Sequence, residues 1–182
     1  NLQKLKIPIF LDLKIHDIPQ TVKKTIDTLS SLKPDILNVH ALGGKKMMQY
    51  ALESLSNNSP YTQLVAVTIL TSLDNDDLQM MKIDISTKDL VSSLARLTKE
   101  SGLSGVVCSS EEIKLVREAC GKNFKIIVPG IRPEGSDKND QKRIMTPKEA
   151  ISLGADHLVI GRPITESKDP RKTAKEIVNS IR

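Results

Sequence analysis

Short apolar segments alternate with helical segments along the whole of this 182-residue chain. The alternation repeats six times, at roughly thirty residues per unit, which predicts a parallel sheet. The predicted strands cover residues 8–13, 35–39, 64–69, 105–108, 125–128 and 157–160. The predicted helices lie near residues 20–32, 45–56, 87–101, 110–120, 146–153 and 169–181. Several helices begin at capping residues, such as Ser109 and Thr146, and Gly102 and Gly154 follow two of them.

Two α/β architectures accept this pattern. An open doubly wound sheet holds six strands, but no G-x-G-x-x-G turn follows the first strand, which weakens a dinucleotide-binding version. A TIM (β/α)8 barrel needs eight strands and about 250 residues. We expect a single domain over residues 1–182 that forms such a barrel without its first two βα units, so that six strands are present.

Composition narrows the class of partner. The net charge is +5, yet the basic residues are dispersed and aromatic residues make up only 2% of the chain. Single-stranded nucleic acid needs aromatic stacking platforms, so we expect no nucleic-acid partner. No segment approaches the ~20 apolar residues that span a bilayer, and the start carries no signal-peptide pattern. Cys108 and Cys120 have no metal-ligand spacing, and we expect a cytoplasmic protein with no membrane partner.

Segment 10–21 (FLDLKIHDIPQT) carries the strongest chemical signal. Residues two apart on a strand share a face, so Asp12 and Lys14 should point towards one site, and Asp17 follows where a helix should begin. Two carboxylates around an ammonium keep it protonated and leave local negative charge. Such a site can repel a substrate carboxylate and protonate the carbon left behind. The alternative is a surface ion pair plus an acidic residue that favours the helix start at Pro19.

Thr71 and Ser72 follow the third predicted strand. Their hydroxyls are candidates for hydrogen bonds to a planar polar ligand. Helix capping explains the same residue types equally well. The signal is weak when taken alone.

Segment 129–133 (PGIRP) leads into a long polar stretch, residues 134–143. A loop of this length is uncommon and is often an active-site lid, with Arg132 and Gln141 as its candidate ligand contacts. The alternative is a surface loop. We expect a defined shape, because Pro129 and Pro133 flank the glycine and the arginine.

Segment 159–163 (VIGRP) closes the last predicted strand. Gly161 allows close backbone approach to a ligand, and Arg162 can bind phosphate through two nitrogens. In barrels the loops after the last two strands commonly bind phosphate, which favours that interpretation over a turn with a surface arginine. His16, His40 and His157 show no metal-ligand spacing, and we assign no metal.

Taken together, these segments resemble the bacterial type of orotidine 5′-phosphate decarboxylase over essentially the whole chain. The matching segments are 10–21 (FLDLKIHDIPQT), 38–41 (NVHA), 66–72 (AVTILTS), 105–109 (GVVCS), 129–133 (PGIRP), 140–147 (DQKRIMTP) and 159–163 (VIGRP). The pattern D-x-K-x-x-D alone is shared with sugar-phosphate decarboxylases of the same superfamily. The I-P-x-T extension and the PGIRP loop make the assignment specific.

The resemblance implies a barrel enzyme, working as a homodimer without cofactor or metal. It would convert orotidine 5′-phosphate to UMP in de novo pyrimidine biosynthesis. It implies that Lys14 donates a proton to C6 and that Asp12 lies against the departing carboxyl group. Other residues carry implied roles in the neighbouring subunit's site (Asp17, Ile18, Thr21), in substrate contact (Thr71, Ser72), and in the lid and phosphate site (Arg132, Gln141, Gly161, Arg162).

The chain departs from the family pattern in one respect. Family members have two further βα units before the first strand seen here, which supply an aspartate and a lysine. We therefore expect these residues to belong to a longer chain of roughly 240 residues, in line with the usual barrel size. Two other functions stay open: a catalytically incomplete remnant that binds a nucleotide phosphate, and a metal-dependent sugar-phosphate decarboxylase of the same superfamily.

Overall fold

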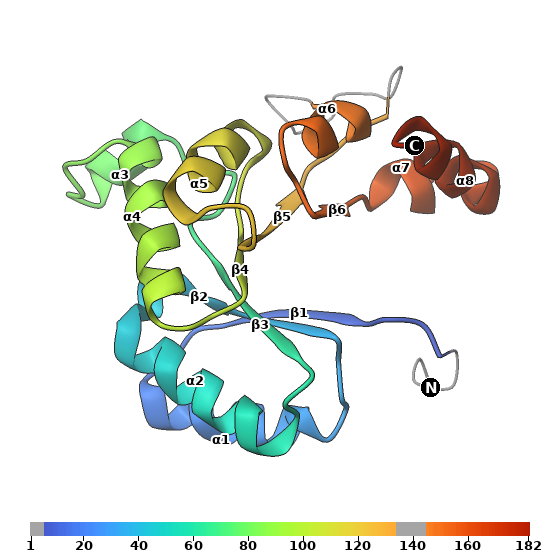
Figure 1. Cartoon of the computed structure of the whole chain (residues 1–182). Coiled ribbons are helices and arrows are strands. Elements are labelled where there is room, and N and C mark those ends of the chain that lie inside the picture. The colour runs from blue at the N-terminus through green and yellow to red at the C-terminus, as the bar shows by residue number, and fades with distance from the viewer. Residues whose placement is uncertain (1–5, 134–144) are drawn as a thin grey trace. The chain divides into compact units, whose positions relative to one another are not determined.

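A computed structural model of the chain describes residues 6–133 and 145–182 (Figure 1). The chain divides into two compact units, Asn1–Val106 and Val107–Arg182. The expectation of a single domain stays a prediction.

Three parallel strands and their connecting helices open the first unit. The elements in chain order are β1 (Phe10–Ile15), α1 (Pro19–Ser30), β2 (Ile36–His40), the 3-10 helix η2 (Ala41–Gly43), α2 (Gly44–Asn58), β3 (Gln63–Val67), α3 (Asn75–Met80) and α4 (Thr87–Glu100). β1 pairs with β2, and β2 pairs with β3 in an unbroken register from Ile36↔Gln63 to His40↔Val67. The strand β4 (Gly105–Val107) follows at the boundary between the units.

Helices α1 and α2 pack side by side in this unit (Figure 1). Val22 and Ile26, one turn apart on α1, are fully buried, as are Met47, Met48 and Ala51 on α2. This spacing gives each helix one apolar stripe. The interior of β2 and β3 is buried as well, as expected for parallel strands that are covered on both faces.

The second unit repeats the alternation of strand and helix. After β4 come the 3-10 helix η3 (Ser110–Glu112), α5 (Ile113–Cys120), β5 (Lys125–Pro129), α6 (Pro147–Ser152), β6 (His157–Val159), α7 (Arg162–Thr165) and α8 (Pro170–Ser180). β5 and β6 are parallel, with Ile127 opposite His157 and Pro129 opposite Val159. The core contains Ile113 and Val116 of α5 and the apolar side chains of β5.

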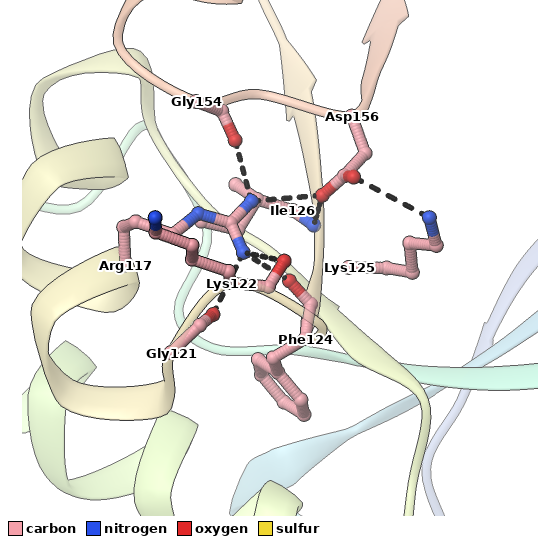
Figure 2. A network of polar contacts seen from close by, with 8 residues as sticks. All are labelled: Arg117, Gly121, Lys122, Phe124, Lys125, Ile126, Gly154 and Asp156. Atoms are coloured by element: carbon pink, nitrogen blue, oxygen red, sulfur yellow. Dashed lines mark hydrogen bonds and ion pairs between the residues drawn. The ribbon is translucent and has the colours of Figure 1, made fainter.

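Arg117 joins α5 to the starts of β5 and β6 within this unit (Figure 2). Its guanidinium donates hydrogen bonds to the carbonyl oxygens of Gly121, Lys122, Phe124 and Gly154 and to the carboxylate of Asp156. Asp156 also accepts from the Ile126 N–H at 2.9 Å and lies 3.4 Å from the Lys125 ammonium. One arginine thus joins the segments that precede β5 and β6, because a guanidinium offers several donors in a rigid plane.

The fold predicted from the sequence is confirmed. The strands follow the order β1-β2-β3-β4-β5-β6, and the observed α/β architecture is that of a β/α barrel protein. Ser109 and Thr146 form capping boxes at η3 and α6, as predicted. Gly102 and Gly154 adopt positive φ just after α4 and α6. Among the residues that the structure describes, no helix is long and apolar enough to cross a membrane.

Three details differ from the prediction. β1 runs from Phe10 to Ile15 rather than over residues 8–13. Two short helices, α3 and α7, were not predicted, because 6 and 4 residues are too few to show a helical period. Asp74 forms a capping box with Asp77 at the start of α3. An aspartate followed three residues later by a second acidic residue is a pattern that can indicate a helix start from the sequence alone.

Candidate active site

Asp12 and Lys14 on β1 form the ion pair that the sequence predicted. The Lys14 Nζ lies 2.7 Å from Asp12 Oδ1 and 2.8 Å from Oδ2. The two side chains are 42% and 38% exposed, so solvent screens their attraction and the pair adds little to stability. An ammonium that is fixed beside a carboxylate, yet open to solvent, can donate a proton to a bound molecule.

The backbone of β1 is irregular at this pair. Phe10 and Leu11 oppose Ile36 and Leu37, but the next paired residue of β1, Ile15, opposes Val39. Lys14 lies in the gap with φ +50°, in the left-handed region that a lysine rarely occupies. Strained conformations of this kind concentrate at functional sites.

Asn38 of β2 forms hydrogen bonds to β1 within this irregular stretch. Its side chain is fully buried; its Oδ1 accepts from the Lys14 N–H at 2.8 Å, and its Nδ2 donates to Asp12 Oδ1 at 2.6 Å. Asn38 is not among the residues that the sequence predicts for this site. An amide in an otherwise apolar buried strand was the available signal, because buried polar groups need partners.

Two histidines lie near the ion pair. The rings of His16 and His40 stack with centroids 5.3 Å apart. Burial lowers the pKa of His40, the nearby His16 and Lys14 lower it further, and Asp12 opposes them. His40 therefore favours its neutral form.

Asp17, Ile18 and Thr21 are solvent-exposed around the start of α1. The Asp17 Oδ1 accepts from the Ile18 N–H at 2.7 Å. Ile18 is 67% exposed. The helix begins at Pro19, as the sequence indicated.

Thr71 and Ser72 lie in an exposed turn between β3 and α3. The turn is closed by a hydrogen bond from the Leu73 N–H to the Leu70 carbonyl oxygen at 3.0 Å. Neither residue caps α3, whose N-cap is Asp74. The capping alternative for these two hydroxyls is therefore wrong.

The predicted anion-binding residues belong to the second unit. Arg132 is only 4% exposed; its N–H donates to the Met145 carbonyl oxygen at 3.1 Å. Gly130 before it has φ +76° and shapes the turn after β5. Gly161 is the N-cap of α7 and has open space where a side chain would begin, and Arg162 starts that helix. Gln141 lies outside the described residues.

The described residues contain no group of three His, Cys, Asp or Glu side chains that could hold a metal ion.

Comparison with known proteins gives one consistent family. Residues 1–177 match the model of the orotidine 5′-phosphate decarboxylase / HUMPS family. The orotidine 5′-phosphate decarboxylase of Actinobacillus pleuropneumoniae serotype 5b is 48% identical over 184 residues, covering 100% of this chain and 79% of the relative. That of Glaesserella parasuis is also 48% identical and covers 99% and 79%.

A solved structure shows the same fold. The crystal structure of orotidine 5′-phosphate decarboxylase from Lactobacillus acidophilus matches with a TM-score of 0.88 at 37% sequence identity. The match covers 99% of this chain and 78% of that structure.

Proposed function

The chain belongs to the orotidine 5′-phosphate decarboxylase / HUMPS family, and from that premise we propose that Lys14 is its catalytic proton donor. Family membership makes the protein a carboxy-lyase of pyrimidine nucleotide synthesis. The proposed substrate is orotidine 5′-phosphate, and the products are UMP and carbon dioxide.

One observation supports the assignment of Lys14: its ammonium lies 2.7 Å from a carboxylate on the same strand. In the proposed step the bond between C6 and the carboxyl carbon breaks, carbon dioxide leaves, and the electron pair stays on C6. An N–H of the Lys14 ammonium then transfers its proton to C6, forming the C–H bond of UMP. The neutral amine recovers a proton from solvent.

Asp12 has a different proposed role. Its carboxylate would lie against the substrate carboxylate and repel it before carbon dioxide leaves, while the ammonium stabilises the developing charge at C6. One charge pair at ~4 Å and an effective dielectric of ~20 is worth roughly 4 kcal/mol. That is about three decades of rate, so binding energy from the remote phosphate has to contribute as well.

We assign the remaining residues by the same family resemblance. Gly161 and Arg162 would bind the phosphate, since an arginine binds phosphate oxygens through two nitrogens. Arg132 and Gln141 would contact the substrate from the loop after β5, and Thr71 and Ser72 from the turn after β3. The exposure of Thr71 and Ser72 is consistent with this assignment.

We further propose a homodimer in which Asp17, Ile18 and Thr21 reach the neighbouring subunit's site. The exposure of Ile18 leaves its side chain available for such a contact.

The test is a turnover assay on the purified protein and two lysine variants. The proposal expects UMP formation by the wild type, a rate at least a thousandfold lower for Lys14→Ala, and an unchanged rate for Lys82→Ala. Lys82 is a matched control because it is exposed and also has a positive φ, +58°. Unchanged turnover in Lys14→Ala would refute the role of Lys14.

Two further measurements separate the alternatives. Binding of UMP by calorimetry without any turnover in the wild type would favour the remnant that only binds a nucleotide phosphate. Turnover that a chelator abolishes would favour a metal-dependent sugar-phosphate decarboxylase.

A further inference from the structure

We infer that Asn38 is a positioning residue that fixes Asp12 and Lys14 relative to each other for catalysis; this inference rests on the proposed decarboxylase function. Asn38 is on β2, whereas both members of the ion pair are on β1. Its two hydrogen bonds reach the Asp12 carboxylate and the Lys14 main chain at 2.6 and 2.8 Å.

Chemistry permits only one orientation of the Asn38 amide. The ionised carboxylate of Asp12 is an acceptor only, and the Lys14 N–H is a donor only. The amide must therefore turn its NH2 group to Asp12 and its oxygen to Lys14. Rotating the amide by half a turn would place two acceptors together and two donors together, so both bonds would be lost at once.

The register between β1 and β2 is irregular at Lys14. Between Leu11 and Ile15, β1 gains two residues relative to β2. The Lys14 N–H consequently donates to the Asn38 side chain. The side-chain amide oxygen of Asn38 here accepts the hydrogen bond that a backbone carbonyl oxygen would accept in a regular sheet.

Burial makes this arrangement rigid. Asn38 is fully buried, while the side chains of Asp12 and Lys14 are about two-fifths exposed. A hydrogen bond in a low-dielectric interior is stronger than one in water, and a buried polar group that loses its partner is unfavourable. The buried amide therefore anchors two half-exposed charged residues, which solvent would otherwise leave free to adopt other rotamers.

Three substitutions separate the two hydrogen bonds. Asn38→Leu removes both and keeps the number and branching of the side-chain heavy atoms. Asn38→Asp keeps the acceptor for the Lys14 N–H but replaces the donor to Asp12 with a second carboxylate. Ser54→Ala is the matched control, because Ser54 is also buried and hydrogen-bonded, to Asp27 at 2.6 Å, where α1 meets α2.

The kinetic result expected for Asn38→Leu is a kcat lower by about tenfold to a hundredfold, because small displacements of catalytic groups have effects of this size. KM for orotidine 5′-phosphate should change much less, since the proposed phosphate contacts are untouched.

For Asn38→Asp we expect in addition a shift of the acid limb of the rate–pH profile to higher pH, because a second carboxylate disfavours ionisation of the first. His16 and His40 also face this site, so the shift is measured against the wild-type profile. Ser54→Ala should lower stability and leave kcat and the pH profile unchanged.

An exchange variant tests positioning against simple loss of stability. In the double variant Asn38→Asp with Asp12→Asn, the carboxylate is on β2 and the amide on β1, so the two side chains can form a hydrogen bond again. We expect it to recover most of the unfolding free energy lost in Asn38→Asp, with no recovery of kcat. A kcat that follows stability across the whole set would overturn the inference.

An activity-independent measurement keeps this inference distinct from the proposed function. In the 15N-labelled unliganded protein, the Asn38 side-chain NH2 resonance should move when Asp12→Asn removes the carboxylate that it hydrogen-bonds, and should not move in Asp84→Asn. If the wild type has no decarboxylase activity but this response is present, the proposed function fails while the anchoring of Asp12 by Asn38 stands. A resonance that does not respond to Asp12 overturns the anchoring itself.

Discussion

Lys14 contacts the Asp12 carboxylate with its ammonium while its own backbone is in the left-handed region, at φ +50°. In a regular strand, residues two apart already share a face, so the contact alone does not require this conformation. The left-handed backbone instead coincides with the irregular register of β1 between Leu11 and Ile15. The function of Lys14 and its backbone strain should therefore be separable by substitution.

Comparing Lys14→Gly with Lys14→Ala isolates the strain. Both variants should lose catalysis, because both lack the ammonium. The glycine variant should be more stable than the alanine variant by about 1 kcal/mol, since glycine occupies positive φ without a steric penalty. Urea unfolding measures the difference. Lys82, with φ +58°, should show a similar gain of glycine over alanine with no effect on turnover. Equal stability of the two Lys14 variants would contradict the assignment of strain.

Mixing subunits tests the proposed shared site. Lys14→Ala and Asp17→Asn should each be nearly inactive alone. If Asp17 serves the neighbouring subunit, a mixed dimer has one site with both substitutions and one with neither. An equimolar mixture that re-equilibrates at random should then regain up to about a quarter of wild-type activity. Sites that lie within a single subunit predict no recovery. A matched mixture of Lys14→Ala with wild type controls for dilution.

The sequence predicted the strands and most helices because these depend on local signals. Buried apolar runs and capping boxes, such as the one formed by Thr146 and Glu149, act within a few residues. The α3 helix was missed because six residues show no period, although its N-cap, Asp74, was visible in the sequence.

The pairing of Asp12 with Lys14 was also predictable, because strand alternation places them on one face. The role of Asn38 was not, because it depends on the irregular register between β1 and β2. That register is a property of two strands whose bonded residues, Lys14 and Asn38, lie 24 positions apart. Such a long-range pairing leaves no local pattern in a single sequence.

Arg117 should be a major source of stability in the second unit. Replacing it with methionine keeps much of the packing volume but leaves the carbonyl oxygens and the Asp156 carboxylate without their donor (Figure 2). Hydrogen bonds to charged groups contribute about 1.5–3 kcal/mol each, but they are not additive, so we expect a loss of about 3 kcal/mol. Urea unfolding with an unchanged m-value measures it. The exposed Arg96→Met is the control, and an equal effect of both would refute the prediction.

Asp156 should make stability depend on acid pH. Partial burial opposes its ionisation, but hydrogen bonds from Ile126 and Arg117 and the charge of Lys125 outweigh burial and lower its pKa. A carboxyl group whose folded pKa is lowered stabilises the protein above its unfolded pKa, about 3.9, and loses this contribution as pH falls through the folded pKa. Asp156→Asn should therefore cost about 2 kcal/mol near neutral pH and progressively less below about pH 4. Asp84→Asn, an exposed carboxylate of the first unit, is the control; a cost independent of pH would contradict the assignment.

His40 should give a second titration of the same sign, in which stability also falls with pH, but at a higher pH, near neutral. Burial, then His16 and Lys14, lower its pKa against the opposing effect of Asp12. The unfolded chain, with an imidazole pKa of about 6.5, therefore binds more protons than the folded chain, so stability falls as pH drops through about 6.5 towards the folded pKa.

The variant His40→Gln lacks this titration. Its unfolding free energy should decrease less than that of the wild type between about pH 7.5 and about pH 5.5. Urea unfolding at both pH values measures the two slopes. His157→Gln removes an exposed imidazole from β6 and controls for histidine content. Parallel slopes in the wild type and His40→Gln would show that the imidazole is not held neutral by its surroundings, and the stacked pair with His16 would then have to tolerate a positive charge.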